Sequence, residues 1–285
     1  MEGFGGLVLN YKLSVMPRFS QVFLNDKEIC ARIAGALEDA SFDRLIEIGP
    51  GGGALTSFLF SRYRALMKAV EIDSALLPAL REKFKGLEVV NADFLKIDLE
   101  QFAGPGRTAF IGNLPYECAT AILEKTLLYG GLEMSVFMFQ KEVARRITAA
   151  PGDSDYGCLS LLTASRASAT LLMDIKAASF TPVPAVDSSV LIFRPKVFFS
   201  VPAEEAAFRS LVRKAFSHRR KTLVNSLGLC GVDKAAAAAA IEKAGFKASV
   251  RAQEISLEGF AGLSTGLQTG KSETSSASLN PYQKR

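Results

Sequence analysis

Histidine and tryptophan are nearly missing from this chain, which has one histidine and no tryptophan among 285 residues. A lone His218 argues against a Ser-His-Asp triad and against a metal site built on histidines. The four cysteines, Cys30, Cys118, Cys158 and Cys230, stand far apart and lack the short paired spacing of zinc or redox motifs. We therefore expect reduced thiols and no bound metal.

Long apolar runs are also absent. No stretch reaches the roughly 18 to 20 residues that a membrane helix needs, and the first residues lack the pattern of a signal peptide. Hydrophobic residues nevertheless make up 48% of the chain, which is enough for a large core. The net charge of +5, with a pI near 9.0, allows a polyanionic partner. We expect a cytoplasmic protein without a membrane span.

Short apolar runs alternate with helical patterns from Arg44 onward. This alternation predicts an α/β fold with a parallel sheet and helices on both of its faces. The expected strands cover residues 45–48, 65–72, 87–91, 108–112 and 135–139. An extended arm at 17–26 should lead into a helix that starts near Lys27, and two later runs, 169–179 and 188–193, should form a hairpin.

The pattern changes after Pro195. Residues 203–263 are typical of short helices and include an alanine run at 235–240, a strong helix former. From Ser264 the composition turns to serine, threonine, glycine and glutamine, as in disordered segments. We therefore expect a catalytic domain with its arm at 1–195, a small all-helical domain at 196–263 and a disordered tail at 264–285.

A glycine-rich segment, E-I-G-P-G-G-G-A-L-T, joins the first expected strand to the helix after it. Gly49 and Gly51 would let the backbone approach a ligand closely and adopt positive φ. With Ala54 they also satisfy the dinucleotide pattern G-x-G-x-x-G/A, so a nicotinamide enzyme has to be considered. By itself the segment therefore does not identify the cofactor.

Three carboxylates at successive strand ends separate these cofactors. Glu71 ends the second strand, where it can accept hydrogen bonds from both hydroxyls of a ribose, with Ile72 beside it. Asp93 follows the third strand and can bind an adenine amine, with Phe94 beside it. Glu47, just before the glycines, can orient the amino acid portion of a cofactor. Each alone would be read as a solvated or capping residue, but together they favour S-adenosylmethionine.

The fourth expected strand ends in I-G-N-L-P-Y, at the edge where open α/β sheets bind ligands. Hydrogen-bond acceptors for both hydrogens of an adenine amine would return its delocalised lone pair to the nitrogen. The Asn113 side chain and the carbonyl of Leu114 or Pro115 can act as these acceptors. A sulfonium methyl is already activated, so its transfer needs alignment more than a strong base. Tyr116 can stack on one face of a flipped-out base and Phe180 on the other. Alone, the motif would indicate only an Asn-led turn with a half-buried tyrosine.

With these motifs in order, the chain resembles the ribosomal RNA adenine dimethyltransferase family. The resemblance covers residues 17–221 and rests on RFSQVFLND, EIGPGGGALT, VEID, NADFL, GNLPYECAT, FMFQKEVARRI, PGDSDYGCLS, FTPVPAVDSSV and RKAFSHRRKTL. It implies a Rossmann-like methyltransferase domain and a small helical domain. It also implies transfer of four methyl groups to two adjacent adenosines near the 3′ end of small-subunit ribosomal RNA, and a role in small-subunit assembly.

The resemblance assigns roles to the N-terminal arm as well. In such enzymes the segment that matches Gln21, Val22 and Leu24 closes over the cofactor, and the residue that matches Asn113 contacts both cofactor and base. The family usually reads G-Q-N-F-L here, whereas this chain reads S-Q-V-F-L. Only the backbone of Val22 can then make the contact expected of an asparagine side chain. Glu117 replaces a polar residue after the tyrosine and adds a negative charge near the substrate path.

Basic residues without acidic neighbours gather between 206 and 232. On a helix, Arg209, Arg213 and Arg220 would fall within about 40° of one another and present a cationic edge to RNA phosphates. Arg219 would point to the apolar side, so we expect the helix to break near Ser217. The residues expected to bind RNA are Lys141, Arg145, Arg146, Arg209, Arg213, Arg219, Arg220 and Lys221. A solvated basic face without RNA is the alternative.

Two other functions share the fold. The antibiotic-resistance branch of the superfamily methylates large-subunit RNA, but Leu114 and the pair Asp187 and Ser188 look more like the small-subunit enzymes. A ribosome assembly factor could keep the fold and lose catalysis, although nothing in the motifs indicates decay. We expect a monomer that acts on small-subunit ribosomal RNA or on the assembling 30S-type subunit.

Overall fold

A mixed sheet forms the centre of the molecule in the computed structural model, which describes residues 22–276, and side chains up to residue 267. Its strands are β2 (Arg44–Ile48), β3 (Met67–Glu71), β4 (Glu88–Asn91), β5 (Thr108–Asn113), β6 (Leu132–Gln140), β7 (Ala167–Ile175) and β9 (Ser188–Pro195). Their order across the sheet is β4-β3-β2-β5-β6-β9-β7. The first five are parallel, and β9 runs antiparallel to both β6 and β7. The α/β fold predicted from the sequence is confirmed.

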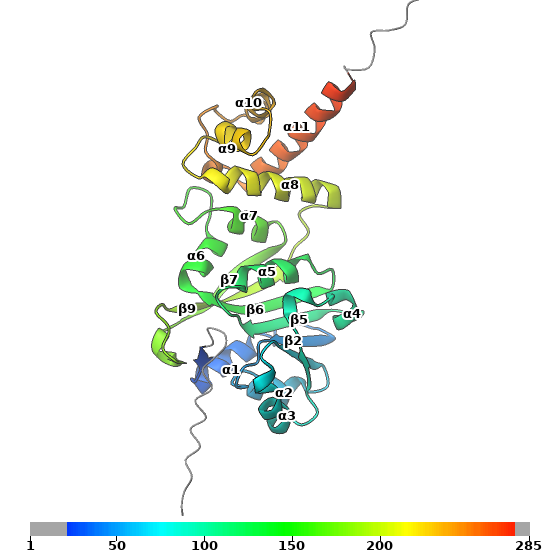
Figure 1. Cartoon of the computed structure of the whole chain (residues 1–285), viewed down its shortest axis with the longest axis vertical. Coiled ribbons are helices and arrows are strands. Elements are labelled where there is room, and N and C mark those ends of the chain that lie inside the picture. The colour runs from blue at the N-terminus through cyan, green and yellow to red at the C-terminus, as the bar shows by residue number, and fades with distance from the viewer. Residues whose placement is uncertain (1–21, 277–285) are drawn as a thin grey trace, which may run out of the picture.

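Two hydrophobic cores cover the faces of this sheet. Successive strand residues point to opposite faces, so in β5 Ala109 and Ile111 enter one core while Phe110 enters the other. The first core includes apolar side chains of α1 (Lys27–Gly35), α2 (Thr56–Tyr63) and α3 (Leu77–Lys83). The second includes those of α4 (Leu99–Ala103), α5 (Ala119–Leu128) and α6 (Lys141–Thr148). Figure 1 shows the sheet between these helices.

The last part of the N-terminal arm is paired with a distant segment. The short strand β1 (Phe23–Leu24) runs antiparallel to β8 (Phe180–Thr181). Helix α1 then begins at Lys27, as predicted, because the Asp26 carboxylate accepts hydrogen bonds from the next free backbone N–H groups, those of Glu28 and Ile29, at 2.9 and 3.1 Å. The arm is thereby held against the segment that enters β9.

A third hydrophobic core lies among helices that Figure 1 shows stacked at one end of the molecule. They are α7 (Cys158–Ala164), α8 (Pro202–Ala215), α9 (Leu223–Leu229), α10 (Lys234–Lys243) and α11 (Leu257–Ser276). Helix α8 gives way at Phe216 to a 3-10 turn, which confirms the expected break near Ser217. Tyr156, which precedes α7, also enters this core, and its hydroxyl donates 2.9 Å to the Ile255 carbonyl.

The prediction of a disordered tail from Ser264 onward is wrong for the first part of that segment. Helix α11 continues to Ser276. Leu263 and Ser264 are buried, and Leu267 packs against the third core. These contacts stabilise helix where the polar composition alone predicted none.

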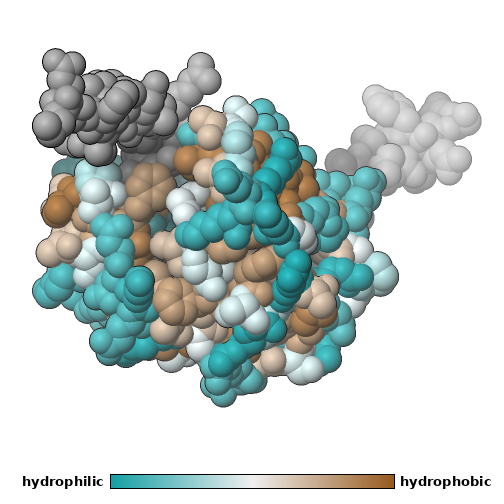
Figure 2. All heavy atoms as spheres, turned by 90° about the horizontal axis from the view of Figure 1, so that it is seen from below, coloured by the Kyte–Doolittle hydropathy of each residue, from teal (hydrophilic) through white to brown (hydrophobic). Residues whose placement is uncertain are grey.

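The surface mixes polar and apolar side chains. Figure 2 shows the end of the molecule opposite α8 to α11, where hydrophobic patches are separated by hydrophilic residues. Such interspersed apolar atoms are ordinary for exposed protein surfaces. Among residues 22–276, no helix combines the length and the apolar character that crossing a membrane requires.

Candidate functional site

A cavity of about 340 Å³ opens at the carboxyl ends of the parallel strands. Parallel strands bring their carboxyl ends to one edge of a sheet, which is where open α/β sheets bind ligands. Residues separated by more than 60 positions, Glu47 in β2 and Asn113 at the end of β5, therefore line the same cavity. Most of the residues singled out from the sequence as cofactor- or base-binding also line it: Val22, Leu24, Gly49, Gly51, Glu71, Ile72, Asp93, Phe94, Leu114, Pro115 and Tyr116.

The glycine turn has the backbone conformation that its sequence predicted. Gly49 and Gly51 have φ values of +67° and +55°, a region that side chains with a Cβ rarely adopt. A Cβ on Gly51 would also lie 3.1 Å from the Phe23 ring. The turn therefore passes close to the arm, and a side chain at position 51 would require the Phe23 ring to shift.

Glu71 ties the glycine turn to the second strand. One oxygen of its buried carboxylate accepts from the Gly51 N–H at 3.0 Å, and the other accepts from the Asp73 N–H at 2.9 Å. Burial raises the pKa of Glu71, although these hydrogen bonds oppose the rise. Each carboxylate oxygen has a second lone pair. Glu71 can therefore position the turn and still accept hydrogen bonds from a ligand.

Glu47 is a buried carboxyl at the inner end of the cavity. The Thr56 hydroxyl donates to it at 2.7 Å. Burial raises the pKa of Glu47 to about 8, the Thr56 hydrogen bond opposes the rise, and the nearby charge of Glu71 adds to it. A positively charged ligand group would favour the ionised form of Glu47.

Asp93 and the residues around it form the apolar end of the cavity. The Asp93 carboxylate accepts from the Leu95 N–H at 3.0 Å and lies 3.7 Å from the Lys96 ammonium. Phe94 is buried, whereas Ile72 and Leu95 keep part of their side chains exposed at the cavity. Two apolar side chains beside one carboxylate suit a flat ring with an exocyclic amine.

The loop after β5 presents acceptors to the cavity. The Asn113 side-chain amide donates to the Val22 carbonyl at 3.0 Å, so its Oδ1 is left as an acceptor. The Pro115 carbonyl accepts from the Cys118 N–H at 3.2 Å. That hydrogen bond favours the Leu114 carbonyl as the second acceptor. The Tyr116 hydroxyl lies 3.3 Å from the Ser188 hydroxyl, which fixes the direction of the ring.

The expected position of Phe180 needs correction. Its side chain is only 1% exposed, because β8 pairs it with Leu24 and the ring packs into the first core. It does not line the cavity. A stacking contact with a base would require the ring to leave that core. Gln21, the other arm residue predicted to bind the cofactor, lies outside the described residues.

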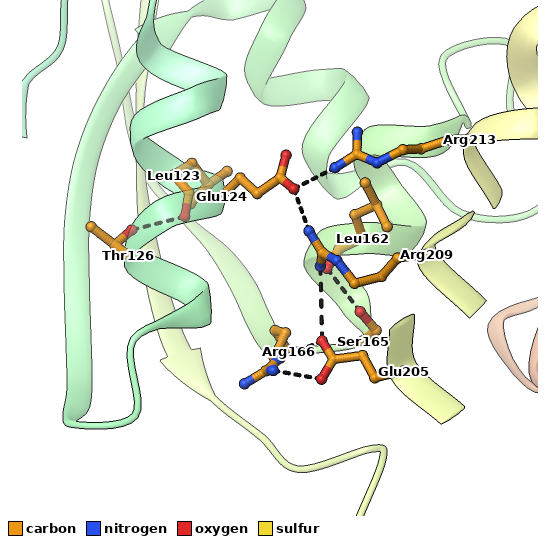
Figure 3. A network of polar contacts seen from close by, with 9 residues as sticks. All are labelled: Leu123, Glu124, Thr126, Leu162, Ser165, Arg166, Glu205, Arg209 and Arg213. Carbon is orange, nitrogen blue, oxygen red and sulfur yellow. Dashed lines mark hydrogen bonds and ion pairs between the residues drawn. The ribbon is translucent and has the colours of Figure 1, made fainter. Parts of the chain in front are cut away.

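Several basic residues expected to contact RNA are instead engaged within the protein. Arg209, 13% exposed, and Arg213 both bind Glu124 (Figure 3). The cationic edge predicted from the helical wheel is therefore wrong for Arg209, because α8 turns this residue toward α5 rather than toward solvent. Lys141 pairs with Asp174.

The other basic residues divide into two kinds. Arg219 donates to the carbonyls of Ser154 and Tyr156 at 2.7 and 3.0 Å, so it anchors the loop before α7. Of the eight basic residues expected to bind RNA, Arg145, Arg146, Arg220 and Lys221 are exposed and make no side-chain hydrogen bond or ion pair with the part of the chain that the structure describes. A charge pattern along a single helix does not reveal such partners, since they come from other parts of the chain.

Sequence reasoning missed some residues of the cavity. Phe23 lines it between Val22 and Leu24, and the motif that surrounds it in the arm was the available signal. Gly112 lines it as well, and a side chain there would clash with β2, since a Cβ would lie 2.5 Å from the Ile48 carbonyl oxygen. No group of three or more potential metal ligands occurs in the part of the chain that the structure describes.

Comparison with known proteins places this geometry among RNA methyltransferases. Residues 13–266 match the family model of ribosomal RNA adenine dimethylase. The chain is 40% identical over 266 residues to the ribosomal RNA small subunit methyltransferase A of Geobacter metallireducens, covering 87% of this chain and 93% of that protein. It is 37% identical over 253 residues to the protein of the same name from Acidobacterium capsulatum, covering 87% and 89% of the two chains.

Solved structures resemble it as well. The 23S rRNA methyltransferase ErmE is 30% identical, with a TM-score of 0.64, over 86% of this chain and 99% of that chain. A dimethyladenosine transferase from Plasmodium falciparum is 24% identical, with a TM-score of 0.72, over 87% of this chain and 98% of that chain. The second likeness is one of fold.

Proposed function

The chain belongs to the ribosomal RNA adenine dimethylase family, and we propose that it transfers methyl groups from S-adenosylmethionine to the exocyclic amine of adenine in small-subunit ribosomal RNA. The targets are two adjacent adenosines near the 3′ end, and the products are dimethyladenosines. One observation carries the proposal: the glycine turn and the loop after β5 line the same cavity. A methyl donor on the turn and an adenine in the loop would therefore meet.

The cavity suits S-adenosylmethionine in both charge and shape. The positive φ of Gly49 and Gly51 lets the backbone approach the donor closely. Glu71 retains lone pairs for the ribose hydroxyls, and Asp93 retains them for the adenine amine. Glu47 would bind the ammonium group of the donor's amino acid portion. When bound, the donor supplies a methyl group that its sulfonium has already activated.

The protein's own residues align the acceptor base. Asn113 Oδ1 and the Leu114 carbonyl accept the two hydrogens of the adenine amine, which directs the nitrogen lone pair toward the donor methyl. Tyr116 stacks on the base, with its hydroxyl held near Ser188. Such a transfer needs no strong base. Much of its rate acceleration therefore comes from holding both reactants in line.

The remaining assignments follow the same proposal. Residues 1–195 carry the methyl transfer, and the helical part, 196–263, contacts RNA through its exposed basic residues. The protein acts as a monomer in the cytoplasm and takes part in assembly of the small (30S-type) subunit. Exposed Arg145, Arg146, Arg220 and Lys221 support RNA contact, because cations neutralise backbone phosphates independently of sequence.

A decisive test compares the two ribosomal RNAs. The protein is incubated with labelled S-adenosylmethionine and with purified small-subunit or large-subunit RNA, and primer extension maps the modified bases. Modification at two adjacent adenosines of the small-subunit RNA is expected. The 30% identity to ErmE makes large-subunit methylation the specific alternative, and modification confined to the large-subunit RNA would establish it.

A further inference from the structure

A network of charged side chains joins the helix after the catalytic loop to the helical part of the molecule. Glu124 lies on α5 and accepts hydrogen bonds from both Arg209 and Arg213 of α8 (Figure 3). Both arginines reach the same oxygen of the Glu124 carboxylate. The contact spans 85 positions of sequence between Glu124 and Arg209.

The network continues inward from Arg209. The Arg209 guanidinium lies 3.8 Å from the Glu205 carboxylate, which in turn accepts from Arg166 at 2.6 Å. Arg209 and Glu205 are 13% and 9% exposed, so water screens their charges poorly. A buried charge that loses its partner is costly, so each member depends on the next. The five residues therefore join α5 and α8 to Arg166, the residue directly before β7.

Helix α5 connects this network to the catalytic cavity. It begins directly after the loop that follows Asn113 and contains Tyr116, and the Ile122 N–H donates to the Cys118 carbonyl at 2.9 Å in its first turn. Cys118 and Ile122 line the cavity. Two residues further along, Glu124 borders a small hollow together with Arg209. The same helix thus lines the cavity through Ile122 and contacts α8 through Glu124.

We propose that Glu124 is a positioning residue, which sets the catalytic loop at a fixed distance and angle from the RNA-contacting helical part by binding Arg209 and Arg213. The inference rests on the proposed function. The exposed Arg220 and Lys221 follow α8 by a few residues, so the setting of α8 decides where bound phosphates lie relative to the cavity. An adenine delivered off line by about 1 Å can lose about 100-fold in transfer rate.

The test separates positioning from folding and from binding. Glu124→Gln keeps the shape and removes the charge, whereas Glu124→Arg repels both arginines. Glu124→Arg combined with Arg213→Glu restores an opposite-charge contact across the same interface. In this double variant Arg209 still has Glu205, and it gains the introduced carboxylate four residues away on its own helix. Glu38→Gln is the matched control, since Glu38 pairs with Arg62 away from α8.

Four quantities are measured on the full chain: the single-turnover methylation rate, the RNA Kd, the S-adenosylmethionine Kd and the Tm. We expect Glu124→Gln to lower the rate about tenfold and Glu124→Arg to lower it further, with both Kd values within about twofold of wild type. The double variant should recover most of the rate, and Glu38→Gln should match wild type.

Other outcomes overturn the inference. An unchanged rate in Glu124→Gln, with or without a lower Tm, would mean that the network only stabilises the fold. A weaker RNA Kd that accounts for the whole rate loss would make the network an RNA contact. A rate loss of the same size in Glu38→Gln would make the effect nonspecific. If Glu124→Arg does not fold, Glu124→Gln still decides the matter. If the wild-type chain itself transfers no methyl group, the proposed function fails instead.

Discussion

The side-chain amide of Asn113 donates a hydrogen bond of 3.0 Å to the main-chain carbonyl of Val22, 91 positions earlier in the sequence. This bond links the end of β5 to the arm and fixes which end of the amide group remains free. Because nitrogen is the donor here, the oxygen is the atom left for an adenine amine. The acceptor is a main-chain carbonyl, which does not depend on the side chain at position 22. Valine there is therefore compatible with the hydrogen bond from Asn113.

Replacing Asn113 with alanine should abolish methylation but leave RNA binding nearly intact. The variant loses an acceptor for the amine hydrogens and the link to the arm, and groups that align or stabilise a reacting centre are typically worth about 100-fold or more. Single-turnover methylation and filter binding of RNA measure the two properties separately. Equal loss of both would count against the catalytic role and favour an assembly factor that only binds.

Val22→Asn should tighten binding of S-adenosylmethionine. Val22 lines the cavity, and an asparagine there adds the polar side chain that related arms carry, while the carbonyl that binds Asn113 stays in place. A new hydrogen bond of about 1 kcal/mol corresponds to roughly fivefold in Kd. Isothermal titration measures it, with Val183→Asn as the control because Val183 is 67% exposed and does not line the cavity. Unchanged binding would show that the cofactor does not need a polar side chain at position 22, and weaker binding would show that asparagine does not fit there.

Tyr116 should act mainly through its ring. Tyr116→Phe loses only the contact of 3.3 Å with Ser188, so its methylation rate should stay within a few-fold of wild type. Tyr116→Ala also loses base stacking, which is worth about 1 to 3 kcal/mol, or roughly 5- to 150-fold. Steady-state kinetics with small-subunit RNA distinguishes the two variants. Similar losses of methylation rate in both variants would show that Tyr116 acts through its hydroxyl rather than through its ring.

The stability of the protein without cofactor should fall as pH rises, because of Glu47. Its pKa is about 8 in the folded protein and 4.5 in its reference state. Between these values the folded protein holds a proton that the unfolded chain has lost, so this contribution to stability is complete below about pH 4.5 and disappears as pH rises through about 8. The Glu47→Gln variant has no such proton to lose.

Thermal unfolding at about pH 5 and about pH 8 tests this dependence. The stability of Glu47→Gln relative to wild type should increase toward the higher pH, by at most about 1.4 kcal/mol for each pH unit. Glu88→Gln is the control, since Glu88 is an exposed residue on the edge strand β4, which β3 separates from the strand that carries Glu47. If the Tm difference between wild type and Glu47→Gln is the same at both pH values, Glu47 is ionised in the folded chain.

Much of the fold followed from local patterns in the sequence. Short apolar runs predicted the five parallel strands to within a few residues, because all of them except the edge strand β4 bury most of both faces. Motif spacing then placed Glu71, Asp93 and Asn113 at strand ends. Since parallel strands end at one edge of the sheet, their convergence on a single cavity could also be inferred.

Other features were decided by contacts between distant segments. The pairing of β1 with β8 buries Phe180, and α8 turns Arg209 toward Glu124 instead of toward solvent. Leu263 and Leu267 of α11 pack on the third core, although the polar composition from Ser264 onward predicted disorder. Composition and periodicity describe how a segment would behave by itself, so they determined the sheet and the residue types of the site. Which charges are neutralised and which rings are buried depends on neighbours that only the folded chain brings together, and tertiary packing decided those.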